Sequence, residues 1–276
     1  MSRTASHART SSASNARTRT SRGGRRERAR GGERARTRTR TNAFDGFDGL
    51  IPPNIDGDLE GLQEEQGATF DELGYAMNYG DVDGERRAIA SGAAVVDRSD
   101  WGMMRTSGTG AIKALRALAK DDRLILTAPG TGFEITLESG DVAQVYAQNE
   151  GFLLITPPRA TAAAFETLAS VPDHQVTELN DRCALLTVCG PTMENILRPM
   201  GLTGVMEAPT GSHVVFGFEN RPVVAAHTPE YGVRGLNLIV DEGIAGQVWA
   251  TITRSGVVPC GNDASNAALI SQSRLK

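Results

Sequence analysis

The hydrophobic and polar positions from about residue 70 onward follow the short periods of a domain that mixes strands and helices. Apolar runs and alternations bounded by Gly, Pro and Asn predict strands over 94–96, 102–107, 124–127, 133–137, 142–148, 152–156, 175–178, 184–188, 214–218, 222–227 and 236–240. Apolar residues three and four positions apart predict helices over 84–92, 109–120, 157–170 and 191–200, and another after Asp241. Several strands follow one another with no helix between them, which favours an α+β fold over a doubly wound parallel sheet. We expect two interlocked subdomains, each an antiparallel sheet with helices.

Residues 1–41 show no such pattern, because they consist almost entirely of Ser, Thr, Ala, Gly and Arg. They carry thirteen arginines and two acidic residues, a net charge of +11, whereas the rest of the chain has a net charge of −15. Such a segment cannot bury a core, and its composition predicts a disordered organelle transit peptide. The alternative is a retained basic arm that binds nucleic-acid phosphates. Nucleic-acid binding is unfavourable, because the tail has no aromatic residue for base stacking and the acidic body repels a polyanion.

Residues 42–66 are acidic and are interrupted by Gly and Pro, as in FDGFDGL at 44–50 and the pair Pro52 and Pro53. We therefore predict a linker without regular structure over 42–66, followed by one folded domain over 67–276. No apolar stretch approaches the ~20 residues that a membrane helix needs, so we expect no membrane association. Three cysteines are too few for a disulfide framework.

The residues that usually carry chemistry are scattered. The Gly-x-Gly pairs at 108–110 and 130–132 lack the rest of a phosphate-binding fingerprint and are typical of turns. The cysteines show no metal-ligand spacing, and no histidine stands in a nucleophile motif, so we expect neither a metal site nor a hydrolase; these residues are Cys183, Cys189, Cys260, His7, His174, His213 and His227. Asp97, Asp100 and Asp141 lie at strand edges, where an acid is either a turn former or a ligand for a hydrogen-bond donor.

Five motifs stand in an order that resembles the glycine-cleavage T-protein superfamily. Residues 92–102 read GAAVVDRSDWG and are followed by RTSG at 105–108 and a predicted helix. The later motifs are DVAQVY at 141–146 ahead of FLLIT at 152–156, ALLTVCGP at 184–191, and QVW at 247–249 with GVVPCG at 256–261. The superfamily contains aminomethyltransferases, demethylases and tetrahydrofolate-binding iron–sulfur assembly proteins of the YgfZ type, including chloroplast members.

The resemblance implies a tetrahydrofolate pocket between the two subdomains, with Asp141 facing the pterin as the catalytic and cofactor-binding carboxylate. Arg98 and Arg234 are candidates for the folate glutamate tail, Trp101 for stacking on the pterin, and Tyr231 for the same cleft. A solvated arginine and a core tryptophan are the alternatives. The resemblance also implies an organellar location, a chloroplast rather than a mitochondrion, and iron–sulfur assembly proteins as partners.

The sequence departs from the superfamily at two points. Val233 stands where the aminomethyltransferases have a glutamate that accepts hydrogen bonds from the pterin. The chain also ends at Lys276, before the Lys-Gly-Cys-Tyr signature and the C-terminal β-barrel of the family, so we expect the fold to lack that barrel. Three functions follow as hypotheses: a folate-binding accessory protein, a folate-dependent aminomethyltransferase or demethylase that uses Asp141, and an interaction domain that has lost the ligand.

Overall fold

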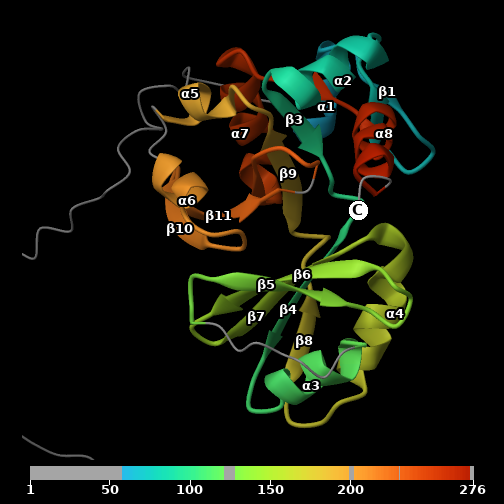
Figure 1. Ribbon diagram of the computed structural model, residues 1–276, viewed down its shortest axis with the longest axis vertical. Coiled ribbons are helices and arrows are strands. Elements are labelled where there is room, and N and C mark those ends of the chain that lie inside the picture. The colour runs from blue at the N-terminus through green and yellow to red at the C-terminus, as the bar shows by residue number, and fades with distance from the viewer. Residues whose placement is uncertain (1–57, 121–127, 199–201, 230, 274–276) are drawn as a thin grey trace, which may run out of the picture. The chain divides into compact units, whose positions relative to one another are not determined.

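The computed structural model describes residues 58–120, 128–198, 202–229 and 231–273 (Figure 1). The predicted transit peptide at 1–41 and the predicted strand at 124–127 lie outside the described residues. Two large sheets make up most of the described chain. Each sheet is open, because each of its two edge strands is paired on one side only. The α+β prediction is confirmed.

The larger sheet has six strands in the order β10-β11-β12-β9-β3-β13. Its strands are β3 (Ala94–Asp97), β9 (Cys183–Cys189), β10 (His213–Phe218), β11 (Arg221–Thr228), β12 (Gly235–Asp241) and β13 (Val258–Cys260). All neighbours are antiparallel except β13, which pairs in parallel with β3. The antiparallel sheets expected from the sequence are present, with this one parallel pair added at the edge of the larger sheet. Pro259 is tolerated there because an edge strand leaves one row of N–H groups unpaired.

The smaller sheet has five antiparallel strands in the order β5-β6-β7-β4-β8. Its strands are β4 (Gly102–Ser107), β5 (Gly132–Thr136), β6 (Val142–Gln148), β7 (Gly151–Thr156) and β8 (Gln175–Glu178). The chain leaves the larger sheet after β3 and returns to it at β9. The two subdomains are therefore interlocked, as the sequence predicts.

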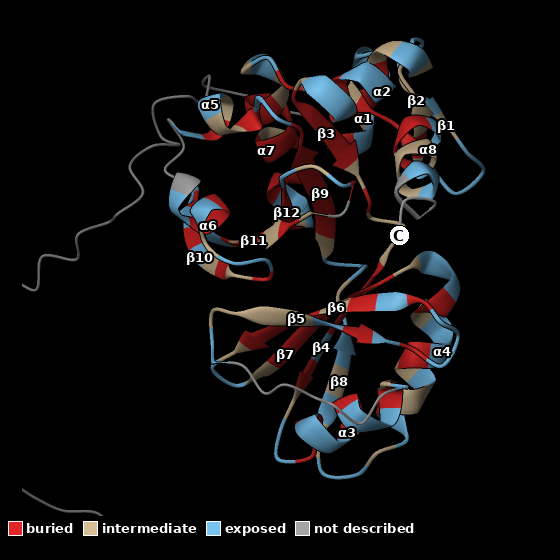
Figure 2. Cartoon of the chain, viewed as in Figure 1, coloured by how far each residue is buried: buried red, intermediate tan, exposed pale blue. Residues whose placement is uncertain are grey.

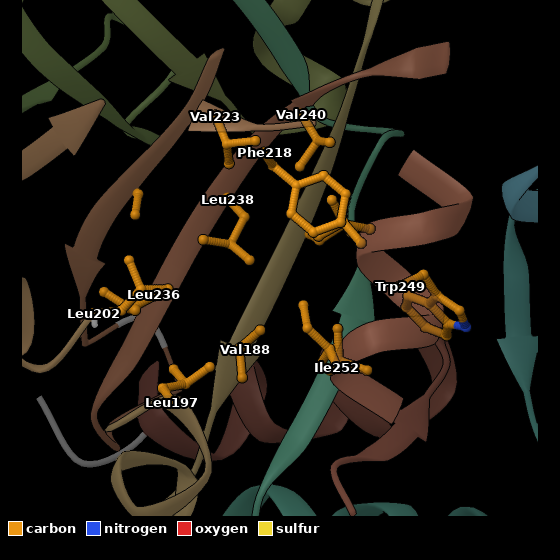
Figure 3. Close-up of a cluster of buried hydrophobic side chains, with 14 of the residues drawn as sticks. Val188, Leu197, Leu202, Phe218, Val223, Leu236, Leu238, Val240, Trp249 and Ile252 are labelled. Carbon is orange, nitrogen blue, oxygen red and sulfur yellow. The ribbon is translucent and has the colours of Figure 1, made fainter. Parts of the chain in front are cut away.

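Helices cover the outer faces of both sheets (Figure 2): α5 (Met193–Leu197), α6 (Thr203–Glu207) and α7 (Glu242–Arg254) lie on the larger sheet, and α3 (Ala111–Leu118) and α4 (Pro158–Ala169) lie on the smaller one. Helices α2 (Val82–Ser91) and α8 (Asn262–Ser273) pack on the opposite face of the larger sheet, against Ala94 and Val96 of β3. Strand residues alternate between faces, so Val188 of β9 and Leu236 and Leu238 of β12 join Trp249 and Ile252 of α7 in one buried cluster (Figure 3). Helix α7 is capped by Asp241, whose side chain accepts a hydrogen bond from the Gly243 N–H.

The inner faces of the two sheets meet. Leu185 and Ile239 of the larger sheet pack against Met103, Leu153 and Ile155 of the smaller one, and all five are buried. Burial of apolar surface contributes roughly 25 cal/mol per Å². This contact therefore holds the two sheets face to face and fixes which side chains lie between them.

Helix α1 (Leu59–Glu65) lies inside the segment predicted to be a linker, so that prediction is wrong over 59–65. Asp58 caps the helix by accepting a hydrogen bond from the Gly61 N–H at 2.8 Å. Buried Gln63 donates to Asp97 Oδ2 at 2.9 Å, and Gln66 accepts from the Trp249 indole N–H at 2.9 Å. These long-range contacts hold a segment whose composition alone favours a loop, and the folded domain extends at least to residue 58.

The buried carboxylate of Glu85 joins three segments of the chain beside strand β13 of the larger sheet. Glu85 of α2 is 3% exposed; its Oε1 accepts from the Tyr79 N–H at 2.7 Å and its Oε2 from the Gly261 N–H at 2.9 Å. Tyr79 directly follows the hairpin of β1 (Thr69–Phe70) and β2 (Ala76–Asn78), and Gly261 joins β13 to α8. Bonds from backbone N–H groups to a charged acceptor contribute ~1.5 to 3 kcal/mol each.

Candidate functional site

Polar side chains lie between the two sheets because of the same strand alternation. In β6, residues 143, 145 and 147 face the helices, so Gln144 and Tyr146 face the larger sheet. In β9 and β12 the apolar neighbours face α7, so Thr187 and Asn237 face the smaller sheet. Asn237 and Thr187 are fully buried and Tyr146 is 2% exposed. A polar group at such a position needs a hydrogen-bond partner.

The four side chains form one hydrogen-bond network that crosses the interface. Asn237 Nδ2 donates to Gln144 Oε1 at 2.8 Å and to the Tyr146 hydroxyl at 3.3 Å. The Tyr146 hydroxyl donates to Gln144 Oε1 at 2.6 Å, and Thr187 Oγ1 donates to Asn237 Oδ1 at 2.7 Å. Gln144 Nε2 reaches Thr228 Oγ1 of β11 at 3.3 Å. Every member is an amide or a hydroxyl, so the network carries no charge near neutral pH.

A cavity of about 240 Å³, the inter-sheet cavity, opens beside this network. It is lined by both sheets and by the segment before β10: Phe133, Glu134, Gln144, Tyr146, Thr210, Gly211, His227, Thr228 and Pro229. The Tyr146 ring lies in its wall, and exposed Glu134 is its acid. Phe133 packs on the helix side of the smaller sheet, and the His227 ring bonds to the Ala208 carbonyl, so strand alternation turns only the Tyr146 ring, of these three, toward the space between the sheets. The size is below the ~300 Å³ at which ligand pockets usually begin, so the cavity has room for a bicyclic ring but not for a whole folate. A tyrosine ring with one carboxylate acceptor beside it suits a flat heterocycle that has N–H donors.

Asp141 does not line this cavity. It lies in the turn between β5 and β6, where its backbone carbonyl accepts from the Leu137 N–H at 2.8 Å. Its carboxylate is 6% exposed, is paired with Arg159 of α4 and accepts from the Ser139 hydroxyl at 2.8 Å. These hydrogen bonds, that from Arg159 above all, hold the pKa of Asp141 below its usual value. The expectation that this carboxylate faces a hollow between the subdomains is wrong for the inter-sheet cavity, and its catalytic use stays a prediction.

Arg98 and Trp101 come together, but they pack on each other. The Arg98 guanidinium lies 3.5 Å from the centre of a Trp101 ring and 5.7 Å from that of Tyr231, and Arg98 is 1% exposed. Cation–π contacts of this kind are worth ~0.5 to 2 kcal/mol. Burial raises the pKa of neighbouring Asp100 to about 6, while the charge of Arg98 opposes this shift. The geometry favours a structural use of Arg98 and Trp101, and neither lines the inter-sheet cavity.

Tyr231 and Val233 line a different hollow, a groove of about 590 Å³ with walls from α2 and α8. Arg234 forms a 3.3 Å ion pair with Glu194 of α5 and is about half exposed. The residues predicted to bind the cofactor therefore do not form one site. Arg98 and Trp101 pack on each other, Tyr231 lines this groove, and Arg234 pairs with Glu194 of α5. A folate-binding use of Tyr231 and Arg234 stays a prediction.

Within the described ranges, no three His, Cys, Asp or Glu side chains group in a way that could hold a metal ion. Burial raises the pKa of the Cys260 thiol well above its usual value, with a smaller effect from Glu85. A thiol in this state is a poor nucleophile and a poor metal ligand.

Comparisons with known proteins identify the fold. No protein-family model matches the sequence. A protein of Arabidopsis thaliana whose name describes a chloroplastic transferase is 24% identical over 234 residues, which cover 81% of this chain and 54% of that protein. An aminomethyltransferase of Mycolicibacterium paratuberculosis is 28% identical over 223 residues, 75% of this chain and 60% of the relative. The crystal structure of aminomethyltransferase T of the Bartonella henselae glycine cleavage system matches with a TM-score of 0.66 and 21% identity, over 77% of this chain and 61% of that one. The chain has the aminomethyltransferase fold.

The resemblance to the T-protein superfamily, predicted from five sequence motifs, is therefore confirmed. The chain spans little more than half the length of these aminomethyltransferase-fold relatives. No helix in the described part of the chain is both long and apolar enough to cross a bilayer.

Sequence reasoning misses the residues of the inter-sheet network. Gln144 and Asn237 stand inside longer motifs, and the sequence patterns predict no chemistry for them. One signal is present: each is a polar residue within a strand whose other residues are largely apolar, VAQVYA and LNLIV. A polar residue at a buried strand position is more informative than an acid at a strand edge, because burial requires a partner.

Proposed function

We propose that this protein binds a reduced folate by its pterin ring in the inter-sheet cavity, as a binding protein built on the aminomethyltransferase fold. The observation that carries the proposal is the cavity lined by Tyr146 and Glu134 beside a neutral amide and hydroxyl network, where the two sheets of that fold meet. The cavity volume suits the ring alone, so the p-aminobenzoyl-glutamate tail would extend outside.

The residues of the wall fit such a ring in three ways. Glu134 can accept N–H donors of the pterin edge at the mouth of the cavity. Tyr146 supplies aromatic surface for the pterin ring. Gln144 donates a hydrogen bond to Thr228, so these two polar groups of the cavity lining are held in place before a ligand binds. Bound tetrahydrofolate would supply the nitrogen atoms that carry one-carbon units.

Binding without group transfer is favoured by the neutrality of the network. A transferase of this kind needs a group that can hold or accept a proton beside the reactive nitrogen. Gln144 and Asn237 are amides that do neither, and the Asp141 carboxylate is paired with Arg159 away from the cavity. The second candidate, an aminomethyltransferase or demethylase, is favoured only by Glu134, the acid in the wall. A Glu134→Gln variant would then lose one-carbon transfer to tetrahydrofolate, whereas a pure binding protein shows no transfer in either form.

We further propose an organellar protein, in a chloroplast rather than a mitochondrion, that acts as an accessory factor in one-carbon metabolism or iron–sulfur cluster assembly. The Arabidopsis thaliana relative with a chloroplastic name and the arginine-rich first 41 residues support the location. Mass spectrometry of the protein from plastids tests it: loss of the arginine-rich segment supports import and cleavage, and an intact N-terminus contradicts them.

Thermal unfolding of the full chain with and without 5-formyltetrahydrofolate tests the binding claim. At a ligand concentration a hundredfold above the dissociation constant, binding adds ~2.7 kcal/mol to the free energy of unfolding. For a domain of this size, that corresponds to a rise in Tm of roughly 5 to 10 °C. A melting temperature that does not change with millimolar ligand contradicts the proposal.

A further inference from the structure

His213 stands behind the wall of the inter-sheet cavity. It is the first residue of β10, it is 7% exposed, and its ring meets that of Tyr146 edge to face, with centroids 5.5 Å apart and planes at 64°. Its Nδ1 lies 3.3 Å from the carbonyl oxygen of Gly211, which is itself part of the cavity wall. The His213 ring is therefore in contact with one wall residue and hydrogen-bonded to another.

We infer that His213 is a positioning residue for the proposed folate site: the neutral ring holds the Tyr146 phenol in place, and protonation of the ring releases it. This inference rests on the proposed function and names how that same site is regulated by pH. The chain of contacts is continuous. His213 abuts the Tyr146 ring, the Tyr146 hydroxyl donates to Gln144, and Gln144 reaches Thr228 at the cavity floor.

The surroundings of His213 favour the neutral ring. Burial lowers the pKa of His213, and the backbone carbonyls of Gly211 and Ala147 partly oppose this. A neutral imidazole has one N–H for these two acceptors, so the ring is held by a hydrogen bond on one side and by packing on the other. An added proton would place a charge at a buried position beside the Tyr146 ring, where desolvation opposes it.

The charged and titratable groups around His213 come from every neighbouring element. Tyr146 of β6 faces its ring, and His227 of β11, next to the paired residue Ala226, bonds to the Ala208 carbonyl. On its outer side, an open hollow of about 550 Å³ contains Arg105 of β4 and Glu150 of the turn between β6 and β7. Burial is the main cause of the lowered His213 pKa, and Glu150 is the acid that lines this hollow with His213.

The test is the affinity of the full chain for 5-formyltetrahydrofolate, measured by calorimetric titration from pH 7.5 to 5.0. We expect the wild-type affinity to fall roughly threefold or more, because each unit of pKa difference between free and bound protein permits up to a tenfold change. A His213→Phe variant keeps a ring beside Tyr146 but has no proton to gain, so its affinity, whatever its value at pH 7.5, should lack the added pH dependence. Any titration of the ligand itself appears equally in both proteins.

Two matched variants separate His213 from the other histidines. His227→Gln removes the histidine in the cavity wall, and His174→Gln removes one at the start of β8, outside this wall. Both should keep the wild-type pH dependence. The inference is overturned if His213→Phe retains that dependence or if His227→Gln abolishes it.

A ligand-free measurement distinguishes failure of this inference from failure of the proposed function. In protein with ¹³C-labelled tyrosine, the Tyr146 ring signal, assigned with a Tyr146→Phe variant, should move between pH 7.5 and 5.0 in the wild type and stay fixed in His213→Phe. If the wild type binds no ligand at any pH but its Tyr146 signal moves with pH, folate binding is rejected and the effect of His213 on Tyr146 is supported. If the Tyr146 signal does not move between pH 7.5 and 5.0, the positioning of Tyr146 by His213 is rejected, whether or not the ligand binds.

Discussion

The buried pair Thr187 and Asn237 allows a quantitative test of the inter-sheet network. An Asn237→Leu variant, similar in volume, removes the bond from Thr187 and the bonds to Gln144 and Tyr146. The Tyr146 hydroxyl still donates to Gln144, so those two groups keep a partner. The Thr187 hydroxyl loses its acceptor at a fully buried position.

The expected cost follows from these contacts. A buried donor left without a partner costs ~1 to 3 kcal/mol, and each lost neutral hydrogen bond removes ~0.5 to 1.5 kcal/mol of net stabilisation. We therefore expect Asn237→Leu to lower the free energy of unfolding by about 3 kcal/mol. Thr187→Val, which leaves only Asn237 Oδ1 without its donor, should cost about 2 kcal/mol.

The double variant, which combines Thr187→Val with Asn237→Leu, separates this reasoning from a general packing defect. With apolar side chains at both positions, neither leaves the other with an unpaired group, so the double variant should be ~1 to 2 kcal/mol more stable than the sum of the single effects predicts. Urea unfolding with a common m value measures all four proteins. Additivity within about 0.5 kcal/mol would refute the coupling on which the network rests.

Two further variants test residues outside the network. Glu85→Gln replaces a carboxylate oxygen that accepts the Tyr79 or Gly261 N–H with an amide donor, so thermal unfolding should show a loss of ~2 to 3 kcal/mol; an unchanged melting temperature would contradict the three-segment contact. Asp141→Asn should leave folate affinity unchanged and lower stability at neutral pH, because it breaks the pair with Arg159. The pKa of Asp141 is lowered in the folded protein, so the pair's contribution is complete above the unfolded pKa near 4 and is lost progressively as the pH falls from there through the lower pKa of the folded state. Variant and wild type should therefore converge in stability in acid, and a tenfold loss of folate affinity would restore Asp141 to the site.

The strands can be predicted more closely than the segments held by distant contacts. The ranges 102–107, 142–148 and 175–178 match β4, β6 and β8 residue for residue, because alternation is a local property of a strand. The composition around helix α1 predicts a linker, since the stability of this helix comes from Asp97 and Trp249, far along the chain. The sequence pattern predicts no strand around Pro259, and pairing with β3 makes β13 a strand.

The site shows where sequence reasoning stops. The sequence places the motif DVAQVY in the correct strand, but the face that each residue presents depends on what covers the sheet. Helices cover the face of Ala143 and Val145, which leaves Gln144 toward the other sheet and Asp141 in the turn. The sequence motif therefore points to the carboxylate of Asp141 as the ligand-binding group, whereas the proposed site uses the amide of Gln144, three residues later.

The central claim is that a pterin ring binds between the two sheets, next to Gln144. Calorimetric titration of the full chain with 5-formyltetrahydrofolate at pH 7.5 tests it with two variants of the same strand and the same face. Gln144→Leu removes a polar group of the cavity wall, whereas Gln148→Leu makes the same change in the neighbouring hollow outside it. The account predicts saturable binding that Gln144→Leu weakens at least tenfold and Gln148→Leu leaves intact. Equal affinities in all three proteins, or no binding in the wild type, would contradict it.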